Sequence, residues 1–262
     1  MLFRTRTCRP APNRFCFCAR YCLISKPEKP LKVRKKVAIL QPNYIPWKGY
    51  FDLINRVDEF VVFDEVQYTA KDWRNRNLIK TPAGVQWLTI PVKVQARSQK
   101  IFETETENQH WRAKHWKSLL ANYAKAKCFS LYAEPLEALY LSDESANLVD
   151  IDLKFMSFVC RVLGITTRLS LSTSIPAHAE GRMGRIREIL AHTKAEVFIN
   201  GPKAKSFMPD DAFEDMGIQL EWMDYEGYPE YLQFHPPFTH GVSILDLLFH
   251  CGEDAKRQMP GF

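Results

Sequence analysis

Two short apolar runs, 37–40 and 59–63, stand near the start of the patterned part of the chain, and each is followed by polar residues. Runs of this length between turn residues are typical of strands buried on both faces. Pro42 ends the first run, and the segment between the runs carries apolar side chains at helical spacing. The pattern predicts a strand, a helix that begins near Trp47, and a second strand parallel to the first.

The loops that follow these two strands define the first candidate site. Parallel strands joined by a helical crossover end at the same edge of a sheet, where α/β proteins bind their ligands. Segments 41–49 and 64–77 should therefore share one rim. Both are rich in polar side chains, so the sequence predicts a ligand site there.

Strand-like and helix-like patterns alternate along the rest of the chain. Helical patterns cover 108–127, 147–163, 181–193, 210–216 and 244–250, and strand-like runs cover 86–94, 167–172, 196–199 and 218–223. Ser243 is expected to cap the last helix. The alternation predicts an α/β fold with a mainly parallel, Rossmann-like sheet flanked by helices.

Charge divides the 262-residue chain into two parts. Residues 1–36 hold eleven lysines and arginines and one acidic residue, while the remainder holds 25 basic and 29 acidic residues and so carries a net charge of −4. We interpret 1–35 as a disordered basic arm or mis-started extension, and 36–262 as one α/β domain. An arginine-rich, acid-poor start is also compatible with a transit peptide.

The acidic body lacks the basic face that is typical of a nucleic-acid-binding fold, so a nucleic-acid partner is not expected. No apolar run reaches the roughly 18 residues needed for a transmembrane segment. We expect a cytoplasmic protein. The histidines and cysteines show no recognised ligand spacing, and no metal site is expected.

Six segments of the chain carry unusual sequence motifs. They are 41–51 (Gln-Pro-Asn-Tyr-Ile-Pro-Trp-Lys-Gly-Tyr-Phe), 63–68 (Phe-Asp-Glu-Val-Gln-Tyr), 71–80, 84–92, 200–202 and 243–248. Together they closely resemble the WbqC-like family over about residues 36–252. The resemblance implies a role in bacterial O-antigen or other surface-polysaccharide biosynthesis, because the family is associated with such gene sets. It does not specify the reaction.

The rim carries side chains suited to an anionic, sugar-containing ligand. Arginine forks match phosphate and carboxylate oxygens, amides orient polar groups, and a glycine-containing loop can form a backbone nest for phosphate. The predicted binding residues are Gln41, Asn43, Tyr44, Trp47, Gly49, Tyr50, Arg74, Asn75, Arg76 and Asn77, with Asn200, Gly201 and Lys203 after a later strand. A solvated charged face and a bare turn would explain the same residues without a ligand.

Three residues at the rim are candidates for catalysis. Asp64 and Glu65 follow the second strand, where a carboxylate can act as a general base toward a substrate amine or hydroxyl, and Lys71 lies in the same segment. The structural alternative is that the two carboxylates cap a turn and pair with Arg74 and Arg76.

The turn after the first strand has a weaker likeness to the HxGH turn of nucleotidyltransferases and class I aminoacyl-tRNA synthetases. Aligned on the glycine, the chain reads Trp47-Lys48-Gly49-Tyr50, so both histidines that stabilise phosphate charge are replaced. Lys48 and Tyr50 can supply a charge and a hydrogen bond instead. Adenylyl transfer through the usual residues is therefore not expected.

We expect an enzyme that transfers an acyl or aminoacyl group to a nucleotide-linked or lipid-linked sugar, with a nucleotide or an activated acyl donor as co-substrate. Two alternatives stay open. One is an ATP-using nucleotidyltransferase or ligase with an altered HxGH turn, which ATP and magnesium dependence would reveal. The other is a non-catalytic protein that binds polysaccharide-assembly enzymes.

Overall fold

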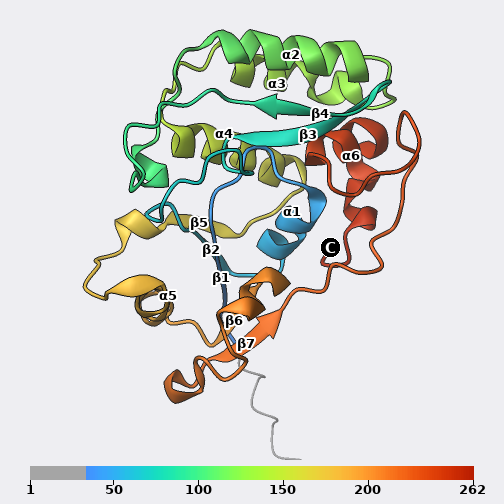
Figure 1. Cartoon of the computed structure of the whole chain (residues 1–262). Coiled ribbons are helices and arrows are strands. Elements are labelled where there is room, and N and C mark those ends of the chain that lie inside the picture. The colour runs from blue at the N-terminus through green and yellow to red at the C-terminus, as the bar shows by residue number, and fades with distance from the viewer. Residues whose placement is uncertain (1–33) are drawn as a thin grey trace, which may run out of the picture. The chain divides into compact units, whose positions relative to one another are not determined.

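The computed structural model describes residues 34–262, and its centre is a five-stranded parallel sheet (Figure 1). The strands are β1 (Lys36–Leu40), β2 (Glu59–Val62), β5 (Arg168–Leu171), β6 (Val197–Asn200) and β7 (Gln219–Trp222), in the spatial order β5-β2-β1-β6-β7. All neighbouring pairs in this sheet are parallel. The predicted α/β class is confirmed.

The strand order reverses beside β1. The chain builds outward from β1 through β2 to β5, then returns to place β6 on the other side of β1 and β7 beyond it. In doubly wound sheets, the crevice outside the carboxyl ends of the strands at such a reversal is the usual ligand site. Here that position lies between β1 and β6.

The segment from β1 to β2 is the predicted strand–helix–strand unit, with α1 (Lys48–Asn55) between the two strands. The helix begins after Trp47, whose backbone is extended at the N-cap position. Gly49 is required at this start, because a Cβ atom there would lie 2.4 Å from the Trp47 ring. The close approach of that ring fixes how the loop enters the helix.

Helices cover both faces of the sheet and bury two separate apolar clusters. On one side α1 shares a cluster with α2 (His110–Tyr123), α3 (Phe129–Leu141), α4 (Leu148–Val162) and α6 (Ile244–Cys251). On the other side α5 (Gly181–His192) packs on inward-facing residues of β1, β2 and β6. Burial on both faces explains why the central strands are continuous apolar runs.

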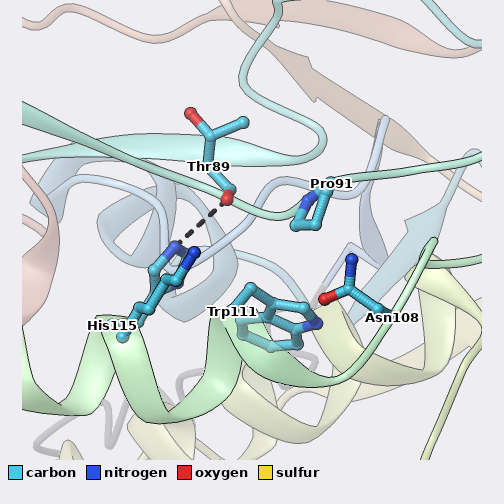
Figure 2. Close-up of a pocket in the computed structure, with 6 residues that line it drawn as sticks. Thr89, Pro91, Asn108, Trp111 and His115 are labelled. Atoms are coloured by element: carbon cyan, nitrogen blue, oxygen red, sulfur yellow. Dashed lines mark hydrogen bonds between the residues drawn. The ribbon is translucent and has the colours of Figure 1, made fainter.

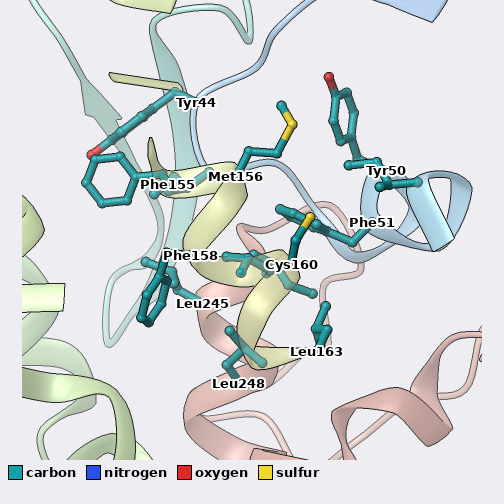
Figure 3. Close-up of a cluster of buried hydrophobic side chains, with 14 of the residues drawn as sticks. Tyr44, Tyr50, Phe51, Phe155, Met156, Phe158, Cys160, Leu163, Leu245 and Leu248 are labelled. Atoms are coloured by element: carbon teal, nitrogen blue, oxygen red, sulfur yellow. The ribbon is translucent and has the colours of Figure 1, made fainter. Parts of the chain in front are cut away.

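Figure 3 shows the middle of the larger cluster, where α4 contributes its apolar stripe. Phe155 lies beside Tyr44, with ring centroids 5.5 Å apart, and Phe158 lies near Leu245 of α6. All four side chains are at most 4% exposed. α4 therefore joins the first loop to the last helix through the core.

A two-stranded antiparallel hairpin, β3 (Arg76–Thr81) and β4 (Gly84–Thr89), stands apart from the main sheet. The predicted rim segment 64–77 runs into this hairpin, because β3 begins at Arg76. A hydrogen bond joins the hairpin to α2, in which the Lys80 N–H donates to the Tyr123 hydroxyl at 2.8 Å. Tertiary pairing turns a polar segment into a strand.

Two other elements differ from the sequence patterns. α3 was not predicted, and it contains Pro135, a residue type that usually ends or kinks a helix. The helix predicted over 210–216 is limited to the 3₁₀ turn Glu214–Met216. The remaining 3₁₀ turns are Ile101–Glu103, Ser172–Ser174, Pro202–Ser206 and Gly252–Gln258.

The start of α6 is bonded to two earlier parts of the chain. The Ser243 side chain accepts from the Leu245 N–H, which confirms the predicted cap. The Ser243 N–H donates to the Leu78 carbonyl at 2.8 Å, and the Ile244 N–H donates to the Pro46 carbonyl at 2.9 Å. The last helix is thus anchored on the hairpin and on the loop after β1.

At the other end of the described chain, the Lys35 carbonyl accepts hydrogen bonds from Glu196 and Val197 at the start of β6. The rest of the predicted basic arm, 1–33, lies outside the described residues. Within residues 34–262, none of the helices combines the length and apolar character that crossing a bilayer requires.

Candidate functional site

The carboxyl ends of β1 and β6 lie at the strand reversal, and each is followed by predicted binding residues. Gln41 and Asn43 come after β1. Asn200 ends β6, and its side-chain oxygen accepts the Gly201 N–H at 2.7 Å, while Lys203 is exposed on the following turn. The fold therefore brings both predicted loops to one edge of the sheet.

Asp152 is the most unusual residue near this edge. It lies on α4, its side chain is 0% exposed, and neither carboxyl oxygen has a hydrogen-bond partner. Burial raises the pKa of Asp152 well above its usual value, and the charge of Arg74 opposes that rise. A buried carboxyl without partners is costly in a folded protein, so its presence calls for a functional explanation.

Arg74 faces two acidic groups. Its Nη1 donates to Asp72 at 2.8 Å, whereas its Nε is buried and has no partner. Burial lowers the pKa of the Arg74 guanidinium, against the opposing charges of Asp72, Tyr50 and Asp152. One side of the guanidinium is thus fixed by the loop, and its Nε–H remains available to a ligand.

Two tyrosines lie within the electrostatic influence of the same carboxyl. Burial raises the pKa of Tyr50 well above its usual value, and that of Tyr68 to about 12, with Asp152 adding to both effects. The Tyr50 hydroxyl donates to the Gln41 carbonyl at 2.8 Å. We name Arg74, Asp152, Tyr50 and Tyr68 the Asp152 cluster, which joins α4 to α1 and to the loops after β1 and β2.

Further polar atoms of the same loops are buried without partners. They are Oδ1 of Asn43, Oδ1 of Asn75 and Nε of Arg76. Buried polar groups are usually satisfied, and each exception needs an explanation.

Other predicted binding residues are bonded within the protein. Asn77 donates to the carbonyls of Tyr44 and Ile45, both at 2.9 Å. These bonds hold Ile45 at a φ of 36°, a strained value for a β-branched residue. Tyr44 itself is fully buried and hydrogen-bonded to Tyr140 at 2.7 Å. Asn77 and Tyr44 therefore shape the loop.

The aromatic residue at the helix start is also engaged. Trp47 packs against Tyr225 and Tyr228, with ring centroids 5.0 and 5.8 Å away. The neighbouring Lys48 donates from Nζ to the Pro229 carbonyl at 2.7 Å, and burial lowers its pKa to about 8. The segment after β7 thus packs directly on this turn.

The predicted general bases have structural partners. Asp64 accepts from the Ser172 hydroxyl at 2.7 Å and from the N–H and hydroxyl of Thr173 at 3.1 and 2.8 Å. Glu65 pairs with Arg185 at 2.6 Å. The turn-capping alternative thus describes Asp64, whereas the expected ion pairs with Arg74 and Arg76 do not form.

The third catalytic candidate and Arg76 lie at the surface side of the hairpin. Lys71 is exposed, with a φ of 57°, and its carbonyl accepts from Arg76. The Arg76 guanidinium lies 4.0 Å from the centre of the Trp87 ring, in a cation–π contact. Arg76 is therefore held on the hairpin with its buried Nε free.

Sequence reasoning missed Asp152. Its signal was present, because Asp152 falls on the apolar stripe of the helix predicted over 147–163, between Leu148 and Phe155. A charged residue at a core position of an amphipathic helix is unusual and deserved a functional hypothesis. Within residues 34–262, no group of three or more His, Cys, Asp or Glu side chains is placed to hold a metal ion.

The five parallel strands, their reversed order beside β1 and the helices on both faces define a doubly wound α/β protein. Residues 41–258 match the WbqC-like protein family, and the chain belongs to that family. A relative from Mycobacterium tuberculosis, named "Uncharacterized protein Rv1507c", is 44% identical over 222 residues, which cover 84% of this chain and 96% of the relative. No solved structure shows significant similarity to the chain.

Proposed function

We propose that this protein transfers an acyl or aminoacyl group to an amine or hydroxyl of a nucleotide-linked or lipid-linked sugar in bacterial surface-polysaccharide biosynthesis. The pathway follows from the resemblance of its motifs to the WbqC-like family. The chemistry rests on one observation, the buried and unpartnered Asp152 carboxyl beside the free Arg74 Nε–H.

Asp152 is the proposed general base. A carboxyl whose pKa is raised by burial holds a proton more strongly than an exposed one, so it can accept the proton of the acceptor group during the reaction and release it afterward. Burial supplies that rise here. Asp64 and Glu65 already have partners within the protein, because Asp64 accepts from the Ser172 hydroxyl and Glu65 pairs with Arg185.

In the proposed reaction, the acceptor nitrogen or oxygen attacks the carbonyl carbon of an activated acyl donor. The carbonyl π electrons move to oxygen, where the Arg74 Nε–H stabilises the negative charge. The acceptor proton passes to Asp152 as the new bond forms. The oxygen electrons then restore the carbonyl, the leaving group departs with its bonding pair, and Asp152 returns the proton to it.

The free acceptor and donor atoms of the loops fit these two reactants. Oδ1 of Asn43 can accept from the attacking amine or hydroxyl, and Nε of Arg76 can donate to the donor or to phosphate. In this proposal, Lys203 and the Gly201 turn at the end of β6 bind the phosphates of a nucleotide or lipid carrier.

The strand order supports a second candidate function. A parallel sheet whose order reverses beside its first strand is the architecture of many nucleotide-binding enzymes. An ATP-using ligase would activate its own acyl group at the strand reversal before transferring it. Fold alone does not choose between the two reactions.

The test is an assay of the full chain with nucleotide-linked amino sugars, an acyl thioester, and amino acids with or without ATP and magnesium. Asp152→Asn should lower product formation at least about a hundredfold, as expected for a lost general base. The matched control is Asp150→Asn, because Asp150 lies on the same helix but is exposed. Full activity of folded Asp152→Asn protein would overturn the proposal, and strict ATP dependence would favour the ligase.

A further inference from the structure

A depression of about 320 Å³ lies between the hairpin and α2, separate from the Asp152 cluster (Figure 2). Its lining consists of Thr89 at the end of β4, Pro91 after that strand, Asn108 before α2, and Trp111, Lys114 and His115 on α2. The volume is at the lower end of the range for small-molecule sites. It is large enough for a small organic molecule.

The indole of Trp111 supplies an unused donor to this depression. Trp111 is 2% exposed, and its Nε1–H is buried without a hydrogen-bond partner. Figure 2 shows the indole nitrogen on the edge of the ring that faces Asn108. A buried indole N–H normally finds an acceptor. The depression therefore lacks an acceptor atom that a ligand would provide.

Trp116 shows the ordinary arrangement on the same helix. It is 4% exposed, and its Nε1–H donates to Glu137 at 2.9 Å. Both indoles are buried on α2, but only the Nε1–H of Trp116 has a hydrogen-bond acceptor. The free Trp111 donor is not a general consequence of burying tryptophan on α2.

The other polar groups of the lining are also donors or are occupied. Asn108 accepts the His110 N–H through Oδ1 at 3.0 Å, and Figure 2 shows its amide nitrogen on the side of Pro91, another residue of the lining. Lys114 contributes a cationic amine. His115 directs Nε2–H to the Thr89 carbonyl at 3.2 Å. No carboxylate lines the depression.

The position of this site at the start of α2 adds to its positive potential. α2 is 14 residues long and begins at His110, so its first N–H groups and its dipole favour negative charge near Asn108. Burial lowers the pKa of His115 to about 4, so its imidazole is neutral at pH 7 and the cation of the site is Lys114.

We infer that this depression binds a small ligand through a carboxylate or phosphate group, whose oxygens accept from Trp111 and Asn108 and pair with Lys114. The site is independent of the proposed acyl transfer. None of its lining residues belongs to the Asp152 cluster.

Nuclear magnetic resonance of the full chain with ¹⁵N-labelled tryptophan tests this inference. The six tryptophans give one indole N–H signal each, and Trp111→Phe assigns the signal of Trp111. Inorganic phosphate, acetate and sodium chloride are titrated separately at constant ionic strength. The expected result is a saturable downfield shift of the Trp111 signal with phosphate or acetate, while the Trp116 signal stays in place.

Two variants complete the test. Lys114→Met, at an exposed position, should weaken binding of the effective anion roughly tenfold, the order of one charge-assisted hydrogen bond. Asp152→Asn should bind the anion as the wild type does. Response to phosphate or to acetate identifies the class of ligand. The absence of a saturable Trp111 shift with both anions, or equal shifts of Trp111 and Trp116, would overturn the inference.

Discussion

Asp152 and Arg74 lie close enough for the guanidinium to lower the pKa of the carboxyl, yet both oxygens of Asp152 and the Nε of Arg74 have no hydrogen-bond partner. A buried ion pair is normally closed by direct hydrogen bonds, because the desolvation cost is otherwise not offset. In the proposed reaction, these unpartnered groups of Asp152 and Arg74 contact the substrate.

Asp152 should make the protein less stable as pH rises. Its folded pKa lies above the value of the unfolded chain, so its contribution to stability is complete below about pH 4 and declines as the pH rises toward the folded pKa. Asp152→Asn removes this titration. Melting temperatures of wild type and variant, measured from pH 4 to 8, should therefore diverge in favour of the variant. Parallel curves would show that the carboxyl titrates normally.

Glu65→Gln should lower the stability of the protein without lowering its turnover. The change weakens the contact with Arg185 and should lower the free energy of unfolding by roughly 1–3 kcal/mol. Turnover should stay within about twofold of wild type, because the proposed base is Asp152. Glu188→Gln is the matched control, since Glu188 contacts the same arginine at 2.6 Å. If Glu65 is the base, only the Glu65 variant will lose activity.

His115 should resist protonation. Burial lowers its pKa to about 4, so the native state holds a neutral imidazole while the unfolded chain takes up a proton near pH 6.5. Stability from this residue is therefore present above about pH 6.5 and is lost as the pH falls toward 4. Imidazole chemical shifts of His115 should show the Nε2–H form still dominant at pH 5. A charged ring at that pH would refute this account of the Tyr44–His115 contact.

Gly49→Ala should be strongly destabilising. The added methyl group would lie 2.4 Å from the Trp47 ring, so the ring must leave its place against Tyr225. Overpacking of this kind costs about 1–3 kcal/mol. Gly241→Ala is the control, because nothing lies within 4 Å of the Cβ position there. Chemical denaturation measures both, and equal stability of the two variants would contradict the predicted clash.

The sequence predicted the individual strands because each strand is formed by one short, continuous apolar run. The apolar runs at 37–40 and 59–63 are strands buried on both faces, and a helix of the expected span connects them. The order of the strands depends on crossovers between distant segments. The sequence therefore predicted a rim but not the reversal beside β1 that places Asn200 next to the first loop.

The hairpin and the site were less predictable for the same reason. Polar residues over 71–80 resemble a loop, and only pairing such as Leu78 with Trp87 makes part of them a strand. Asp152 has an ordinary side chain whose properties come from burial by other elements. Its position on an apolar stripe was visible, but its neighbours Arg74 and Tyr50 were not.

The bonds from Ser243 and Ile244 to the Leu78 and Pro46 carbonyls have a consequence for synthesis on the ribosome. The loop after β1 is translated long before α6, and its Pro46 carbonyl accepts from the Ile244 N–H at the start of that helix. Contacts of such long sequence separation carry a large loop-closure cost in folding. The loop that carries Asn43 therefore reaches its final conformation only after α6 has been synthesised.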